Sequence, residues 1–243
     1  MKRERFLACD KYGVSFCEDN NRIELARKIC AEIKPASLLD VGCGDGGFLQ
    51  IIRQLLPGCR VAGLETSEAA SAIAVKRGLD VRRQDLENSE WPPPNSFQMC
   101  FAGEVIEHLF SPDDFLAEVF RVLEPGGYLL LTTPNLAAWF NRVSLLFGYQ
   151  PIHTEVGTRA NYGHILPLPG TPAGHIRLFT LRALRELVAA SGFTVVRIYG
   201  VGQNVPRTRI ACLRLAAPLL NLIFSHPSLA SGLALLAQKK VVS

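Results

Sequence analysis

The chain has 243 residues, of which 48% are hydrophobic and 20% charged, and its formal net charge is +4. This length fits one domain with a substantial core, and the composition excludes an intrinsically disordered protein. The net charge is too small to indicate by itself a protein that binds nucleic acid.

Helical and extended patterns alternate along the chain. The expected helices are Ile23–Ile33, Phe48–Leu56, Glu68–Arg77, Asp113–Leu123 and Thr180–Ser191. The expected strands are Leu38–Val41, Arg60–Leu64, Asp80–Arg83, Phe97–Ala102, Tyr128–Thr133, Phe193–Tyr199 and one within Leu229–Lys240. The almost wholly apolar fifth strand is expected at the centre of the sheet. The alternation predicts an α/β fold: a doubly wound, mostly parallel, seven-stranded Rossmann-like sheet with helices on both faces and ligands at the carboxyl ends of the strands.

The stretch LLDVGCGDGGFL, residues 38–49, is the most informative part of the chain. It predicts a strand, a tight glycine loop and a helix whose free N–H groups face a ligand. The glycine spacing differs from the G-x-G-x-x-G of dinucleotide-binding loops. Asp40, just before the loop, would repel a pyrophosphate but can hold an ammonium group. S-adenosylmethionine (SAM) is therefore favoured over a nicotinamide cofactor, and an NAD-dependent oxidoreductase is the alternative.

This loop resembles the first motif of the class I SAM-dependent methyltransferases, and further segments resemble that family in its order. They are GLETSE around Glu65, the pair Asp85-Leu86, RVLEPGGYLLLTTPN, and GHIRLFTLRALRELVAASGF. The resemblance covers about residues 23–200. Phe97-Gln98 departs from the Phe-Asp that is frequent in the family, at a position remote from the methyl group.

The resemblance implies a cofactor site spread over several strand ends. Asp40, Gly42 and Gly44 would surround the methionine part, Glu65 would accept both ribose hydroxyls, and Asp85 with Leu86 would contact the adenine. Glu65 could instead be an ordinary acidic residue at a helix start. The full set that we predict to bind the cofactor is Asp40, Gly42, Cys43, Gly44, Glu65, Thr66, Asp85, Leu86 and Gly103.

The run Glu104-Val105-Ile106-Glu107-His108 follows the fourth expected strand and is expected to open a helix. Helical spacing would bring Glu104, Glu107 and His108 to one face. Such a cluster suits a divalent cation, namely Mg²⁺, Mn²⁺, Co²⁺ or Zn²⁺. The E-x-x-E-H pattern is similar to small-RNA 3′-end methyltransferases and ubiquinone-biosynthesis O-methyltransferases, and the first of these implies a further ligand, His175. His108 and His175 are the catalytic candidates. In the alternative without metal, Glu104 borders the methionine moiety and His108 packs or bonds to the backbone.

Two segments are expected to shape the substrate side of a single methyltransferase domain spanning residues 1–243. A lid or substrate segment lies at about residues 134–175, because long irregular connections are usually functional. It contains His153 and His164, expected to be ordinary loop residues, with a role as base as the alternative. The apolar segment 210–237 is expected to complete the sheet and its covering helices, with a membrane contact or a dimer face as alternatives. The oligomeric state is left open.

These features predict SAM-dependent methylation of a hydroxyl on a small metabolite, a sugar or a lipid-linked acceptor. Oxygen is favoured because the acidic cluster suits hydroxyl activation and no Asn-Pro-Pro-Tyr motif follows the fourth strand. RNA ranks lower, since the lid segment lacks a dense Arg/Lys track. A methyltransferase-like binding module without catalysis is the alternative. The charged N-terminus, the lack of a membrane-length apolar run and seven scattered cysteines predict a cytoplasmic protein.

Overall fold

The computed structural model describes residues 21–87, 90–166, 170–202 and 223–241. Its seven strands form one sheet in the order β3-β2-β1-β4-β5-β7-β6. The strands are β1 (Ser37–Val41), β2 (Arg60–Glu65), β3 (Asp80–Arg83), β4 (Phe97–Gly103), β5 (Leu123–Pro134), β6 (Phe193–Val201) and β7 (Gly232–Lys239). The first five run parallel, whereas β7 is antiparallel to both β5 and β6. The predicted fold class is confirmed.

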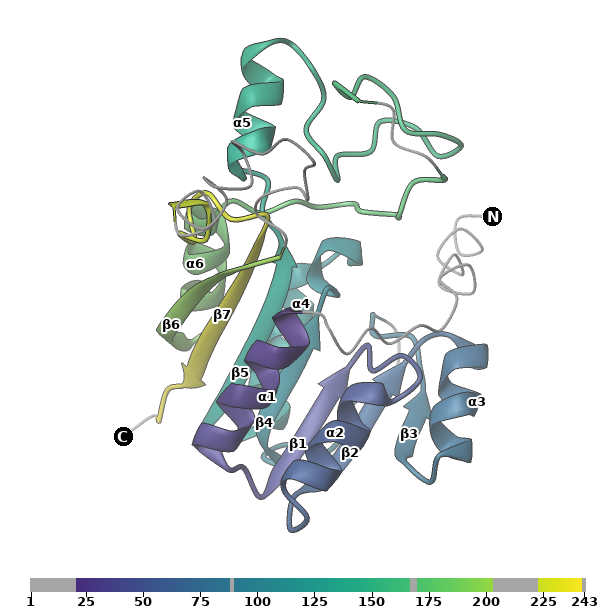
Figure 1. Cartoon of the computed structure of the whole chain (residues 1–243). Helices are drawn as coiled ribbons and strands as arrows, with labels where there is room; N and C mark the ends of the chain where they lie inside the picture. The colour runs from purple at the N-terminus through teal and green to yellow at the C-terminus, as the bar shows by residue number, and fades with distance from the viewer. Residues whose placement is uncertain (1–20, 88–89, 167–169, 203–222, 242–243) are drawn as a thin grey trace, which may run out of the picture.

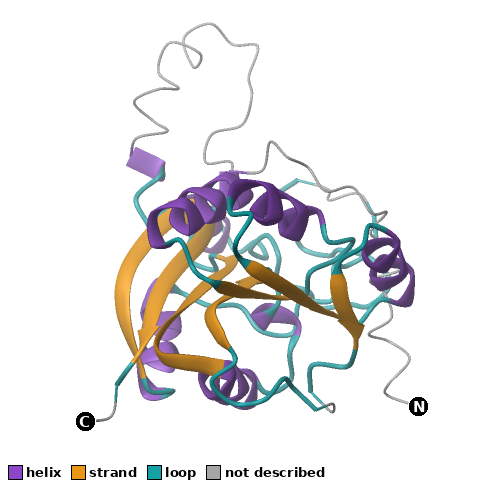
Figure 2. Cartoon of the chain, turned by 90° about the horizontal axis from the view of Figure 1, so that it is seen from below, coloured by secondary structure: helices purple, strands orange, loops and turns teal. Residues whose placement is uncertain are grey.

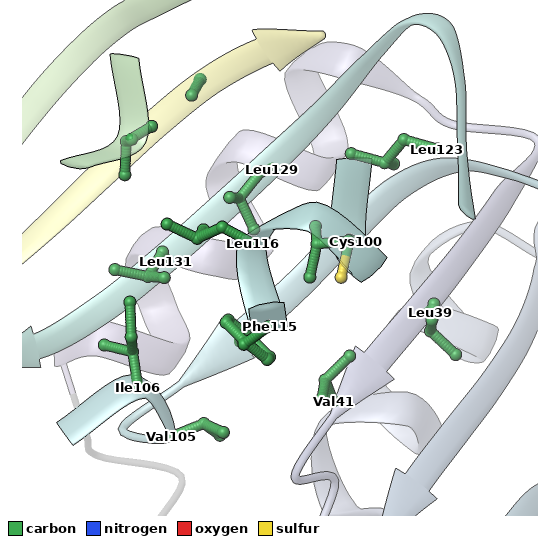
Figure 3. Packing of buried hydrophobic residues seen from close by; sticks show 14 of the residues in the cluster. Leu39, Val41, Cys100, Val105, Ile106, Phe115, Leu116, Leu123, Leu129 and Leu131 are labelled. Atoms are coloured by element: carbon green, nitrogen blue, oxygen red, sulfur yellow. The ribbon is translucent and has the colours of Figure 1, made fainter. Parts of the chain in front are cut away.

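Helices cover both faces of this sheet, as Figure 2 shows from below. They are α1 (Asn21–Ile33), α2 (Gly47–Leu55), α3 (Glu68–Lys76), α4 (Pro112–Val122), α5 (Trp139–Leu146) and α6 (Leu181–Ala190). One apolar core lies under α1, α2 and α3, and a second lies under α4 and α6. In the second core, Leu116 of α4 lies beside Leu129 of β5, and Ile106 lies beside Leu131 (Figure 3).

The strand predicted to be central, β5, lies between β4 and β7. Its burial pattern explains the prediction, since six consecutive residues from Leu129 to Pro134 are buried. The strand begins earlier than expected, at Leu123, because Phe97 of β4 already pairs there before the register shifts.

Helix α5 lies inside the segment expected to be irregular. Its buried residues are polar: Asn141 and Ser144 face inward, while Leu145 and Leu146 are exposed. Asn141 accepts a hydrogen bond from Ile152 N–H at 2.8 Å and donates to Asn135 O at 3.2 Å. Because the polar face is the buried one, the apolar periodicity that normally reveals a helix is inverted here. Figure 1 shows α5 and the segment after it beyond the end of the sheet toward which β1 runs.

The strand predicted within Leu229–Lys240 is confirmed as β7, which begins inside the apolar segment 210–237 and ends two residues beyond it. Residues 210–222 of that segment lie outside the described residues. Among the described helices, none is long and apolar enough to cross a membrane.

Candidate functional site

The glycine loop lies at the carboxyl end of β1 and is fixed to the end of β2. The N–H groups of Gly42 and Cys43 both donate to Leu64 O, at 2.8 and 3.1 Å. Gly42 has a φ of +73°, and a Cβ placed on it would lie 2.5 Å from Val105 Cγ2. A side chain at this position would therefore be strained and would also collide with the segment after β4.

Two buried carboxylates lie beside this loop. Glu65 accepts the Gly44 N–H at 2.8 Å and the Ser67 N–H at 2.7 Å, which leaves lone pairs on both oxygens for ligand hydroxyls. Asp40 is 3% exposed, and burial together with the nearby Glu65 charge raises the pKa of its carboxyl group well above the ordinary value. An ammonium group and a pair of hydroxyls would relieve this arrangement, so the residues fit SAM.

The rest of the predicted cofactor set is distributed around the same edge. Thr66 donates to Gln84 O at 3.2 Å, which joins the ends of β2 and β3, and Asp85 accepts the Glu87 N–H at 3.0 Å. Leu86 O accepts the Trp91 indole N–H at 3.2 Å. Val41 pairs with Ala102, so Gly103 lies level with Gly42.

Cys43 belongs to this loop through its backbone only. A Cβ on Gly63 would lie 2.5 Å from Cys43 Sγ, so the thiol packs down onto β2 in the apolar core. Burial raises the pKa of this thiol, with the charge of Asp40 as the next cause. The Cys43 side chain is therefore a packing group of the loop.

The prediction that a helix begins at Glu104 is wrong. Glu104 has a left-handed φ of +58°, and only Ile106–His108 form a short 3-10 turn. The reason is tertiary, because Glu104 N–H still donates to Thr132 O at 3.0 Å, continuing the β4–β5 ladder. The Glu104 side chain accepts from Thr132 Oγ1 at 3.0 Å and is ion-paired with Arg22 of α1.

Three of the four predicted metal ligands come together. One potential ligand atom from each of Glu107, His108 and His175 lies within 4.8 Å of the others. Glu104 is not part of this group, and its role as a ligand stays a prediction. Its left-handed backbone and its pairing with Arg22 direct it toward α1, although its charge still acts on Glu107.

Glu107 is the most unusual residue of the site. It is 0% exposed, its Oε2 accepts from Thr133 Oγ1 at 3.0 Å, and its Oε1 has no hydrogen-bond partner. Burial, and next the Glu104 charge, raise the pKa of this carboxyl group well above the ordinary value. A buried carboxylate oxygen without a partner is costly unless a cation or a proton is present.

His175 reaches this group through backbone bonds of its own segment. The N–H groups of Ile176 and Arg177 donate to Glu107 O at 2.9 and 3.0 Å. The rings of His108 and His175 lie 4.9 Å apart between centroids. Burial, and next His175, lower the pKa of His108, so this imidazole is neutral near pH 7.

Sequence reasoning missed several residues of the site. Arg22 pairs with Glu104, Thr133 holds Glu107, and Glu155 lies against His175 with Nδ1–Oε1 at 3.2 Å. His153 lies closer to the site than expected, 5.5 Å from the His175 ring between centroids. No local pattern singles these residues out, since each comes from a distant segment. His164 Nδ1 donates to Gln150 O at 3.0 Å, as an ordinary lid residue would.

A family model described as a methyltransferase domain matches residues 18–198. The chain belongs to this methyltransferase domain family. The family-level prediction is thereby confirmed, while the subgroup with E-x-x-E-H stays a prediction. The probable S-adenosylmethionine-dependent methyltransferase of Mycolicibacterium smegmatis is 32% identical over 167 residues, which are 65% of this chain and 61% of that protein.

The ubiquinone biosynthesis O-methyltransferase of Maricaulis maris is 33% identical over 108 residues, 40% of each chain. The chain thus spans 61% and 40% of the length of these two curated relatives. The structure of a Burkholderia thailandensis 1,6-didemethyltoxoflavin-N1-methyltransferase with bound S-adenosylhomocysteine superposes with a TM-score of 0.56 at 18% identity, covering 91% of this chain and 80% of that one. At this identity the likeness shows the fold alone.

Proposed function

We propose that this chain is a SAM-dependent methyltransferase that methylates a hydroxyl group with the help of a divalent cation. The observation that carries the proposal is Glu107 Oε1, a buried carboxylate oxygen without a partner, beside His108 and His175. The E-x-x-E-H pattern predicted such a group, although its geometry differs from the expected one.

The cofactor part rests on Asp40, Glu65 and the glycine loop. Asp40 and Glu65 would accept the ammonium group and the ribose hydroxyls of SAM, and the loop leaves no room for a side chain at Gly42. SAM supplies an activated methyl group, and the protein supplies position and a dry site. When the acceptor oxygen bonds to the methyl carbon, the carbon–sulfur bond breaks, leaving S-adenosylhomocysteine and a methyl ether, and the hydroxyl proton passes to a base.

The donor set of one carboxylate and two imidazoles fits a divalent cation that accepts oxygen and nitrogen ligands, such as Mn²⁺, Co²⁺ or Zn²⁺, with Mg²⁺ the poorer match. Glu107, His108 and His175 would hold it. Such an ion lowers the pKa of a neighbouring hydroxyl. Without a metal, the neutral His108 is the favoured general base, because its lowered pKa keeps its lone pair available near pH 7.

The acceptor is proposed to be a hydroxyl on an apolar or lipid-linked molecule. The lid segment that carries His153 and Glu155 exposes many large apolar side chains, among them Leu146 at 79%, Phe147 at 67% and Leu166 at 70%. One relative is named for ubiquinone biosynthesis, which supports an apolar acceptor methylated at oxygen. Other relatives bear names for different acceptors, such as trans-aconitate and sterols, so the geometry of the site and the lid decides the proposal.

The test is release of S-adenosylhomocysteine from a panel of hydroxyl acceptors, with and without EDTA. We expect EDTA to abolish turnover and to leave SAM affinity within about two-fold, because the ion serves the acceptor. Glu107→Gln should do the same, since it removes the buried charge and keeps the side-chain shape. Glu118→Gln, which alters a carboxylate paired with Arg121 on α4, is the matched control and should be fully active.

Full turnover in excess EDTA would contradict the metal and leave His108 as a plain base. SAM binding without turnover on any acceptor would favour a binding module without catalysis.

A further inference from the structure

Glu155 lies directly against His175, and both side chains are only 9% exposed. Its carboxylate accepts the backbone N–H groups of Ala173, Gly174 and His175, at 2.6, 2.7 and 3.2 Å. Its Oε1 also lies 3.2 Å from His175 Nδ1. One carboxylate thus holds both the backbone and the ring of the segment that delivers His175.

The surroundings of the two imidazoles fix which ring nitrogen carries the proton. His175 Nδ1 faces two oxygens, Glu155 Oε1 and His153 O, each 3.2 Å away. Both are acceptors, so Nδ1 must carry the hydrogen and donate it. His108 Nδ1 likewise lies 3.2 Å from Gly174 O, which can only accept. In the neutral form of each ring, the lone pair is therefore on Nε2, the nitrogen available to a ligand.

We propose that Glu155 is a positioning residue that fixes His175 with its proton on Nδ1, so that Nε2 is directed to the group formed with Glu107 and His108. Through its bond to Gly174 N–H, Glu155 also holds the carbonyl that orients His108. Carboxylates that hold the second nitrogen of a ligand imidazole usually set its orientation and basicity. The inference rests on the proposed function, since it concerns the same three ligands.

A purely structural clamp would hold the backbone of residues 173–175 without affecting the imidazole proton. The matched control for such a clamp is Glu87, which accepts the N–H groups of Phe110 and Ser111, at 2.7 and 2.9 Å. These bonds join Glu87 to a loop, as the bonds of Glu155 do, but neither of the two groups that donate to Glu87 is an imidazole. Glu87→Gln and Glu155→Gln each replace one oxygen and the charge of a carboxylate that accepts loop N–H groups, and they differ in the contact with His175.

The first measurement uses the metal-free full chain and long-range ¹H–¹⁵N correlation NMR, which reports the protonated nitrogen of each imidazole. We expect His175 and His108 in the Nδ1–H form in the unmodified chain. Glu155→Gln should shift His175 to the Nε2–H form in a fraction of the molecules and leave the tautomer of His164 unchanged. Glu87→Gln should change neither tautomer. An Nε2–H form of His175 in the unmodified chain would overturn the inference without any variant having to fold.

The second measurement is calorimetric titration of the same proteins with Co²⁺ alone and with SAM alone. Glu155→Gln should weaken Co²⁺ binding by ~10–100-fold, the usual effect of losing a carboxylate behind a ligand imidazole, and keep SAM affinity within about two-fold. Unchanged Co²⁺ affinity in this variant would overturn the inference and leave the metal site standing. The unmodified chain could also fail to bind Co²⁺ while Glu155→Gln still moves the His175 proton. That result would reject the proposed metal site and keep Glu155 as the residue that positions His175.

Discussion

Asp40 shows how a single residue couples cofactor binding to pH. The pKa of its carboxyl group is raised by burial and then by the charge of Glu65, so below this raised pKa Asp40 is protonated in the cofactor-free protein. A cationic ligand prefers the ionised form, so SAM binding below this raised pKa must release a proton. SAM affinity should therefore increase with pH in that range, by up to ~tenfold per pH unit, and become constant above the raised pKa.

Calorimetry in two buffers with different heats of ionisation measures the released proton. Asp40→Asn should weaken SAM binding by ~10–100-fold, the loss of one charge-assisted hydrogen bond, and should abolish proton release. Asp113→Asn, an exposed residue in the first turn of α4, should leave both quantities unchanged. Proton release that persists in Asp40→Asn would assign the effect to another group.

At the scale of elements, α5 determines what the lid presents to solvent. Its inward face is polar and its outward face carries Leu145 and Leu146, which fits an acceptor with an apolar chain. Leu146→Glu should raise KM several-fold for a long-chain acceptor and leave kcat unchanged, because the change lies outside the reacting group. Val75→Glu, at a 55% exposed position on α3, is the control for an added surface charge. Steady-state kinetics with acceptors that differ only in chain length decide the point, and equal KM values in both variants would contradict an apolar acceptor.

At the scale of the whole molecule, the lid and the sheet are expected to unfold together. Trp91 is buried in the core under α4. Trp139 lies at the start of α5, and its backbone N–H donates to Leu229 O, just before β7, at 2.9 Å. Saturating SAM at 100 times its Kd should stabilise the fold by ~2.7 kcal/mol. Because the residues just before β7 join α5 to the sheet, both tryptophans should report the same shifted transition.

Urea unfolding of the two single-tryptophan variants, Trp91→Phe and Trp139→Phe, measures this by fluorescence. Coincident curves with and without SAM are expected. A Trp139 transition at lower urea that SAM does not move would show that the lid unfolds on its own.

Local patterns sufficed for much of the fold and for the cofactor edge. Residues 38–49 encode strand, loop and helix within one short stretch, and the period of the apolar residues gave the remaining strands and most helices. Gly42 could be singled out because it begins a run of glycines directly after a strand, where the backbone turns with a φ of +73°. Such signals survive in sequence because they depend on neighbours in the chain.

Tertiary structure decided how the candidate ligand residues after β4 and in the lid are arranged. Glu104 has helical spacing to Glu107 and His108, yet its backbone bond to Thr132 on β5 prevents the helix and leaves Glu104 with Arg22. Glu155 meets His175 within the lid, and the N–H groups of Ile176 and Arg177 hold that part of the lid against η3 (Ile106–His108), the short 3-10 turn. The sequence by itself determined the α/β sheet and the glycine loop, and it predicted Glu104, Glu107, His108 and His175 as candidate ligands. Which of them meet, and which nitrogen each imidazole offers, was decided by hydrogen bonds between distant segments, which no local period encodes.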